Sequence, residues 1–355
     1  MSHELIYLDH NATTPLDVEV KKAMMDVLPV FGNPSSSHSI GLAAKAVIEN
    51  ARQQVSRLIM CDPSEIIFTS GGTEANNLAI IGTAYKHQGG HIITSVIEHP
   101  SVANPVKWLE LRGFKATYLQ VDSSGMVSPE DVRKAVRKDT ILITVMHSNN
   151  ETGVLQPIKE IGKIARQYNI LFHSDAAQSV GKMGVDVSDL MVDMLTVVSH
   201  KFYGPKGAGA LYLKSGVDIM PILFGAGHER GLRPGTENTI GIAGLGKTCE
   251  VAAGNMLPRC EHTRKLRDRL FASLKSRLDI TLNGREELRL PNTLNISIRG
   301  INPPIPPLLK GGKGGFVKGI IGEDLVEKLK DRIAFSSGSA CHSGIRKPSP
   351  VLTNP

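Results

Sequence analysis

The sequence is poor in cysteine and in aromatic residues. Its 355 residues include four cysteines and one tryptophan, and Phe, Tyr and Trp together make up 5% of the chain. The cysteines form no Cys-x-x-Cys pair, so the sequence indicates neither a disulfide framework nor a zinc site. They are Cys61, Cys249, Cys260 and Cys341. Such sparse use of cysteine fits a reducing cytoplasm, where a thiol stays available for reaction.

The chain also lacks long apolar runs and a strong charge of either sign. No apolar stretch approaches the length of a membrane span, and the first residues lack the basic and apolar segments of a signal peptide. The net charge of +7 comes from 41 Lys and Arg against 34 Asp and Glu. Without a stripe of basic and aromatic residues, we expect no nucleic-acid binding. The basic excess indicates an ordinary solvated surface or a docking face for an acidic protein partner.

Short apolar runs alternate with helical patterns through the middle of the chain. This order predicts βαβ units, and therefore an α/β fold with a mostly parallel central sheet and helices on both faces. Ligands of such sheets bind at the carboxyl ends of the strands. The expected strands are SEIIFTS, GHIITSV, KATYLQV, TILITVMH, NILFHSD, DMLTVVS and GAGALYL, which together cover positions between 64 and 213.

The pattern changes at about residue 250, which predicts two domains. We expect a large domain over residues 15–250, and a smaller α+β domain formed by residues 1–14 and 251–355. A Pro- and Gly-rich segment at 302–319 interrupts the smaller domain. It is either an exposed loop or an insertion in the gene, because RGI and KGI flank it in near repetition.

Three predicted strand ends carry polar side chains. Gly72 and Thr73 lie in a Gly-Gly-Thr turn that enters a helix, an arrangement that can bind phosphate through backbone N–H groups. His99 follows the next strand and could stack on a planar cofactor and move protons, although a lone histidine is more often structural. Asn150 could bond a ring hydroxyl or simply form a turn.

The next two strand ends carry an acid and a lysine. Asp175 follows a predicted buried strand, where a carboxylate needs a cationic partner such as a protonated pyridine nitrogen. Gln178, three residues further on, could reach the same ring. Lys201 lies between a strand and a Gly-Pro-Lys-Gly turn, where a partly desolvated lysine can react with a carbonyl group. Alone it would be read as a surface charge, but the acid on the preceding strand favours a functional role.

Cys341 lies in a loop of serine and glycine, in the segment FSSGSACHSG. Most cysteines without a disulfide partner are buried and inert. A thiol on a polar, mobile loop could instead approach a substrate sulfur, take it as a persulfide and hand it on.

These motifs, taken in order, resemble the class V aminotransferases, which are fold-type I pyridoxal-phosphate enzymes, and within them the cysteine desulfurases. The resemblance covers nearly the whole chain. It runs through YLDHNATTP, GNPSSSHSIG, TSGGTEANNLAI, MHSNNETG, HSDAAQ, HKFYGPKG, RPGTEN and SSGSACHSG.

The resemblance implies a role for each candidate residue. Lys201 would carry pyridoxal 5'-phosphate, Asp175 would pair with its ring nitrogen, and His99 would stack on the ring and transfer protons. Cys341 would carry the persulfide, for transfer to an acceptor such as an iron–sulfur scaffold or a tRNA-thiolation protein. The other implied cofactor contacts come from Gly72, Thr73, Asn150, Gln178, Ser199, His200 and, in the partner subunit of a homodimer, Thr236.

The sequence departs from this family's pattern in two places. Val198 stands where many relatives have a serine that bonds the phosphate, with Ser199 beside it. Relatives also continue past the PSPVL-like segment to an arginine that binds the substrate carboxylate, and this sequence ends at VLTNP. We therefore expect a C-terminally incomplete small domain and weak affinity for substrate.

Three other functions stay open. A selenocysteine lyase uses the same lysine and cysteine, and the pieces LPNTLNISIRG and ACHSG also resemble that enzyme. Another class V aminotransferase would have no use for the thiol. A truncated homologue could bind the cofactor without activity. The segment SSGSAC favours L-cysteine as the substrate.

Overall fold

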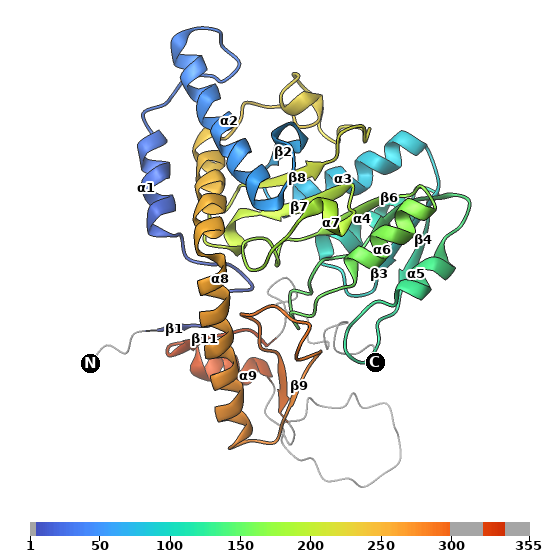
Figure 1. Cartoon of the computed structure of the whole chain (residues 1–355), viewed down its shortest axis with the longest axis vertical. Helices are drawn as coiled ribbons and strands as arrows, with labels where there is room; N and C mark the ends of the chain where they lie inside the picture. The colour runs from blue at the N-terminus through green and yellow to red at the C-terminus, as the bar shows by residue number, and fades with distance from the viewer. Residues whose placement is uncertain (1–4, 299–321, 338–355) are drawn as a thin grey trace.

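A seven-stranded sheet forms the centre of the computed structural model, which describes residues 5–298 and 322–337 (Figure 1). The strand order is β2-β8-β7-β6-β5-β3-β4. Strands β7, β6, β5, β3 and β4 are parallel, and β8 is antiparallel to both of its neighbours. The predicted α/β class is confirmed. The strands are β2 Ile66–Thr69, β3 His91–Ser95, β4 Lys115–Leu119, β5 Thr140–Thr144, β6 Leu171–Asp175, β7 Met194–Val198 and β8 Gly209–Leu213.

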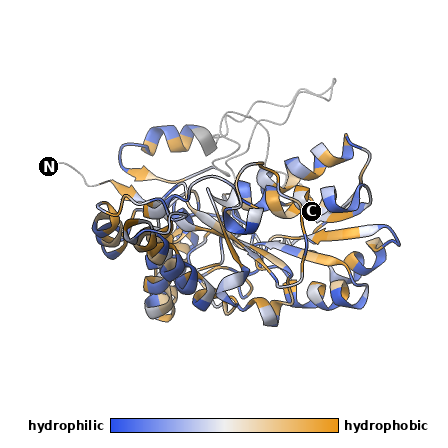
Figure 2. Cartoon of the chain, turned by 90° about the horizontal axis from the view of Figure 1, so that it is seen from above, coloured by the Kyte–Doolittle hydropathy of each residue, from blue (hydrophilic) through white to orange (hydrophobic). Residues whose placement is uncertain are grey.

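Helices cover both faces of this sheet, and successive strand residues point to alternate faces. One buried cluster joins Ile67, Ile92 and Leu142 of the strands to α3 (Gly72–His87) and α4 (Pro100–Glu110). The neighbouring strand residues belong to a second cluster on the other face. There they pack against α2 (Ser39–Ile59), α6 (Ile158–Gln167) and the first part of α8. Figure 2 shows the apolar strands between more polar helix exteriors.

Several helices begin where the sequence supplies a cap. The side chain of Ser128 accepts a hydrogen bond from the N–H of Asp131 at the start of α5 (Pro129–Ala135). In α6 the buried residues Ile158, Ile161 and Ile164 recur at helical spacing, so the helix presents one apolar face to the sheet. Helix α1 (Val18–Val27) packs against α8, and the short α7 (Val187–Leu190) contacts α6.

A single long helix connects the sheet with the lower part of the molecule. Helix α8 (Thr239–Lys275) has 37 residues and runs downward in Figure 1. Below the sheet lie β9 (Ile280–Leu282) and β10 (Ile296–Ile298), which are antiparallel, and α9 (Gly322–Leu329). Strand β1 (Ile6–Tyr7) pairs there with β11 (Ile333–Ala334). The first residues therefore lie beside the C-terminal part, and residue 250 falls inside α8.

Two predictions concern parts of the chain outside the described residues, namely the segment 302–319 and Cys341. Within the described ranges, no helix has both the length and the apolar character needed to cross a membrane.

Candidate active site

Three elements bring the predicted site residues together at one edge of the sheet. Asp175 is the last residue of β6, and Lys201 ends a short 3₁₀ helix, Ser199–Lys201, that follows β7. Helix α3 begins at Gly72 and packs against both strands. The site thus lies at the carboxyl ends of parallel strands, where ligands of such sheets are expected.

A chain of hydrogen bonds connects His99 with Asp175. The Asn76 amide donates to the Ser101 hydroxyl (Nδ2–Oγ 2.8 Å) and to the Asp175 carboxylate (Nδ2–Oδ2 2.7 Å). The Ser101 hydroxyl lies 2.7 Å from His99 Nδ1, and the Ser101 backbone N–H donates to the same nitrogen. Because Nδ1 accepts this N–H, a neutral His99 carries its proton on Nε2. These hydrogen bonds hold the carboxylate of Asp175 and the imidazole of His99 in fixed relative positions.

The carboxylate of Asp175 is buried and has only neutral donors among the described residues. It is 6% exposed and accepts from Asn76 and from the backbone N–H of Ala177. A buried carboxylate is more stable when a cation lies against it, because the cation offsets the cost of removing the charge from water. A protonated pyridine nitrogen would satisfy this requirement.

The start of α3 has the form of a phosphate site. Gly71 is the N-cap residue, with φ of 147°, and no side chain caps the helix. The first backbone N–H groups of this helix of 16 residues are therefore available to an anion at the positive end of its dipole. A Cβ on Gly72 would lie 2.5 Å from Cγ2 of Val198. Gly72 is therefore needed for this close approach, and Thr73 beside it is exposed.

The contact between Gly72 and Val198 shows which side chain at the end of β7 faces α3. Val198 points toward Gly72, whereas the hydroxyl of Ser199 is fully buried against Gly204, whose added Cβ would lie 2.1 Å from it. Ser199 Oγ has no hydrogen-bond partner among the described residues. The geometry therefore gives no support to the predicted phosphate contact through the Ser199 side chain.

Lys201 is half-buried and is held by the N-terminal segment of the chain. Its ammonium donates to the backbone oxygens of Asn11 (2.6 Å) and Ala12 (3.0 Å). The Gln178 amide donates to the same Asn11 oxygen at 2.9 Å, so Gln178 and Lys201 meet at one acceptor. The Asn11 side chain in turn donates to the backbone oxygen of Asn150 at 3.3 Å, which places Asn150 beside this group.

Two neighbouring titratable groups have shifted pKa values. Burial, followed by the positive charges of Lys201, Lys206 and Lys182, lowers the pKa of His200 to about 4. Its ring is therefore neutral at pH 7, and its Nδ1 lies 3.1 Å from the Thr13 hydroxyl. Burial raises the pKa of Glu98 to about 8, so this residue next to His99 is held as a neutral acid.

Thr236 lies apart from this cluster, and Cys341 cannot be compared with it. Thr236 is exposed and lines a separate cavity of 750 Å³ with Arg52 and His228. Cys341 lies outside the described residues.

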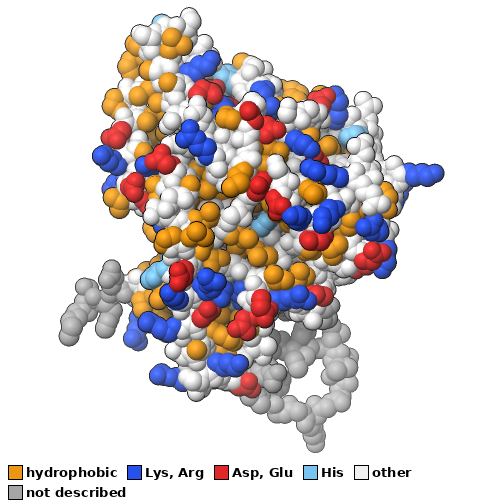
Figure 3. Space-filling view, in the orientation of Figure 1, with side chains coloured by type: hydrophobic (Ala, Val, Ile, Leu, Met, Phe, Trp, Pro, Cys, Tyr) orange, Lys and Arg blue, Asp and Glu red, His pale blue; other side chains and the backbone are white. Residues whose placement is uncertain are grey.

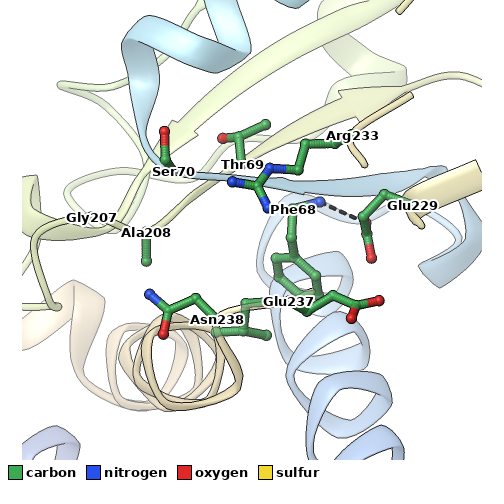
Figure 4. A pocket seen from close by; sticks show the side chains of 10 residues that line it. Phe68, Thr69, Ser70, Gly207, Ala208, Glu229, Arg233, Glu237 and Asn238 are labelled. Atoms are coloured by element: carbon green, nitrogen blue, oxygen red, sulfur yellow. Dashed lines mark hydrogen bonds between the residues drawn. The ribbon is translucent and has the colours of Figure 1, made fainter. Parts of the chain in front are cut away.

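A smaller cavity of 110 Å³ lies beside the approach to α3 (Figure 4). Thr69 and Ser70 line it from the sheet side, and Arg233 and Asn238 line it from the loop before α8. Neither Lys201 nor Asp175 lines either cavity, so both cavities belong to the surface beside the site.

Asn76 and Asn11 are structural partners that the sequence interpretation did not single out. Asn76 follows Gly72 by four residues, which places both on one face of α3. That spacing is a signal in the sequence. Asn11 acts through its backbone oxygen, and no sequence pattern predicts such a contact.

The comparisons with known proteins agree with this geometry. The family model for class V aminotransferases matches residues 6–351. The chain belongs to the class V aminotransferase family. It is 45% identical over 353 residues to a cysteine desulfurase, IscS, of Dictyoglomus turgidum, and the match covers 98% of this chain and 85% of that protein.

Solved structures support the same assignment. A NifS-like protein is 39% identical with a TM-score of 0.80, and the match covers 83% of this chain and 82% of that one. The structure titled "SspA in complex with cysteine" is 35% identical with a TM-score of 0.82, covering 98% and 94%. The predicted family and fold type are confirmed, and class V aminotransferases use pyridoxal phosphate as cofactor.

The residues present fit that cofactor. The N–H groups at the start of α3 can bind the phosphate, and the Asp175 carboxylate can bind the ring nitrogen. Lys201 follows Val198, whose side chain contacts the start of α3, by three residues. His99 is joined to Asp175 through Asn76 and Ser101.

Proposed function

We propose that this chain is a pyridoxal-phosphate-dependent cysteine desulfurase that converts L-cysteine to L-alanine and leaves the sulfur as a persulfide on Cys341. The observation that carries the proposal is the hydrogen-bonded connection of Asp175 with His99, at the same edge of the sheet as Lys201, in a chain 45% identical to a cysteine desulfurase. This function, predicted from the sequence, agrees with the curated relatives and with the structures that the chain resembles.

The proposed division of labour follows from the contacts. Bound pyridoxal phosphate supplies an electron-poor ring that accepts electron density from the substrate Cα. The carboxylate of Asp175 would keep the ring nitrogen protonated, and Lys201 would hold the cofactor through its amine. Gln178 and Asn150, which both bond to Asn11, would contact the ring.

Proton transfer is assigned to His99. Its Nδ1 accepts from Ser101, so its Nε2 is the nitrogen that holds the mobile proton. The fixed tautomer follows from Ser101 and Asn76, whose bonds lead back to Asp175.

The sulfur step is assigned to Cys341. Its thiolate attacks the substrate sulfur, so that a sulfur–sulfur bond forms and the bond between that sulfur and Cβ breaks. The carbon fragment keeps the electron pair, takes up a proton and leaves as alanine. In support of this assignment, the other three cysteines are disfavoured as thiolates. Burial is the main cause that raises the pKa of each of them, Cys61, Cys249 and Cys260.

Partners beyond the substrate belong to the same proposal. We infer a homodimer in which Thr236 serves the neighbouring site. In support, apolar side chains gather at the upper tip of the molecule in Figure 3. The segment between α1 and α2 also holds Phe31, which is 82% exposed, and Asn33 of the same segment lines the 750 Å³ cavity together with Thr236. A sulfur-acceptor protein, such as an iron–sulfur scaffold, would take the persulfide.

Three further predictions complete the proposal. They are a cytoplasmic location, a large cofactor-binding domain over residues 15–250, and a small domain formed by residues 1–14 and 251–355. Helix α8 would then span the boundary between the two domains.

The thiol assignment is tested with Cys341→Ser, and Cys61→Ser is the matched control. Cys61 is half-buried, and after burial the charges of Glu65 and Asp62 add to the rise in its pKa, so its thiol should not react. We expect Cys341→Ser to abolish sulfide and alanine formation from L-cysteine, while Cys61→Ser keeps wild-type rates. Undiminished alanine formation by Cys341→Ser would contradict the proposal. The ratio of turnover on selenocysteine to turnover on cysteine, measured with the wild type, separates the desulfurase from a selenocysteine lyase.

A further inference from the structure

A second lysine, Lys182, is buried close to Lys201. It lies in the turn after β6 and is 9% exposed. Buried lysines are nearly always paired with a carboxylate, because an unpaired buried ammonium is costly. In the part of the chain that the structure describes, the Lys182 ammonium forms no ion pair and donates instead to the amide oxygen of Gln178 (Nζ–Oε1 2.9 Å).

This bond fixes the orientation of the Gln178 amide. An ammonium can only donate, so it must meet the amide oxygen, and a backbone carbonyl can only accept, so it must meet the amide NH₂. Lys182 lies beside the oxygen of the Gln178 amide, and the backbone oxygen of Asn11 lies 2.9 Å from the amide nitrogen, Nε2. Both contacts therefore require the same orientation of the amide, in which its NH₂ group faces the Asn11 oxygen that also accepts from Lys201.

The groups around Lys182 are basic or neutral. Lys201 and His200 face it from the 3₁₀ helix after β7, and His10 faces it from the N-terminal segment. From α8, the thiol of Cys260 donates to the Lys182 backbone oxygen at 2.7 Å. Burial, followed by the positive charge of Lys201, lowers the pKa of Lys182 to about 7, so Lys182 is mainly an ammonium, which can only donate, below that pH.

We propose that Lys182 is a positioning residue of the active site, which holds the Gln178 amide with its NH₂ group toward Lys201 and the cofactor ring. The inference rests on the proposed function, because it takes Gln178 to be a contact of the ring. With Lys182 in place, Gln178 presents a donor to the ring oxygen. Without it, the amide can turn and present an acceptor, which would repel that oxygen.

The consequence is measurable in the bound cofactor. The cofactor bound to Lys201 carries a proton at low pH and loses it as the pH rises, which changes its absorbance. A hydrogen-bond donor to the ring oxygen and a nearby positive charge both lower the pKa of that proton. Losing Lys182 removes both effects, so the pH midpoint of the absorbance change should rise. One lost hydrogen bond corresponds to a rise of about one pH unit and a loss of cofactor affinity of about tenfold.

The experiment uses holoenzyme of the wild type, Lys182→Met, Lys182→Arg and Gln178→Glu. Lys163→Met, which removes an exposed lysine of α6, is the control for net charge. Each protein is titrated spectrophotometrically, and the affinity for pyridoxal phosphate is measured by reconstitution. Thermal unfolding reports the folded state. Gln178→Glu tests the same contact if Lys182→Met folds poorly, because a carboxylate would pair with Lys182 and offer the ring only acceptors.

We expect Lys182→Met and Gln178→Glu to raise the midpoint, and Lys182→Arg and Lys163→Met to stay within about 0.3 pH units of the wild type, because arginine also only donates. Wild-type midpoint and affinity in Lys182→Met, even with a lower unfolding temperature, would reduce Lys182 to a structural residue and overturn the inference. A wild type with no cofactor absorbance would overturn the proposed function, and with it the inference.

Discussion

The buried ion pair between Arg52 and Glu229 offers a quantitative test of how the loop before α8 is held. The two side chains form two parallel hydrogen bonds, Nη1–Oε2 of 3.0 Å and Nη2–Oε1 of 2.7 Å. The Phe68 backbone N–H also donates to Glu229 Oε2 at 2.7 Å (Figure 4). The side chains are 12% and 2% exposed. The pair thus anchors the loop that carries Thr236 to edge strand β2.

Glu229→Gln removes the negative charge and keeps the shape. Breaking a buried pair leaves an uncompensated charge, which costs about 3–5 kcal/mol. For 355 residues, an unfolding entropy of about 2.1 cal/mol/K per residue means that each kcal/mol lowers the unfolding temperature by about 1.3 °C. We therefore expect a fall of about 4–7 °C in a thermal unfolding scan of the apoprotein. The double variant Arg52→Met/Glu229→Met removes both charges and should recover much of this loss, because apolar replacement of a whole pair is often neutral.

Glu49→Gln is the matched control. Glu49 contacts the same guanidinium, with 3.2 Å between Arg52 Nε and Glu49 Oε2, but its side chain is 48% exposed. An exposed pair contributes about 0–1 kcal/mol. The reasoning is refuted if Glu229→Gln lowers the unfolding temperature no more than Glu49→Gln does.

Three further predictions concern the active site. Gly72→Ala places a Cβ 2.5 Å from the Val198 side chain, so affinity for pyridoxal phosphate should fall at least about tenfold; an unchanged dissociation constant would exclude the phosphate cradle. Asp175→Asn keeps the size of a residue that is 6% exposed but removes its charge, so turnover of L-cysteine should fall by about 100-fold or more while the protein stays folded; near-normal turnover would remove its assigned role. The pKa of Glu98, raised by burial to about 8, makes the native state bind more protons than the unfolded state between about pH 4.5 and 8, so this residue's contribution to stability is lost as the pH rises through that range. Urea unfolding should therefore show Glu98→Gln gaining stability relative to the wild type from pH 5 to pH 8, and a constant difference would contradict the shift.

The strands could be predicted because their apolar runs are bounded by polar turns. All seven expected strands are present in the sheet, and predicted site residues lie at or just after strand ends, as with Asp175 at the end of β6. The antiparallel direction of β8 was not predicted, because strand direction depends on which neighbour the chain meets in space. Residue 250 marks a change in pattern, but α8 passes through it without a break and even includes Pro258.

The side-chain contacts of the site were only partly predictable. The two faces of a strand alternate, so Val198 faces Gly72 while Ser199 faces Gly204; a sequence alone does not say which of two neighbours faces a ligand. Likewise, nothing in the sequence around Lys182 indicates that this lysine is buried. Its partner Gln178 precedes it by four residues, but the backbone of Asn11 that completes the contact comes from the N-terminal segment, far away in the sequence.

The most direct test of the account is alanine formation from L-cysteine by the purified chain reconstituted with pyridoxal phosphate, compared with Lys201→Ala. Lys201 donates to the backbone oxygens of Asn11 and Ala12, and we expect the variant to lose these bonds and stay folded. We predict that the wild type forms alanine and absorbs near about 420 nm, a band of the cofactor bound to a lysine, and that Lys201→Ala lacks both. Equal alanine formation by the two proteins, or a wild type that neither binds the cofactor nor forms alanine, would contradict the proposed desulfurase.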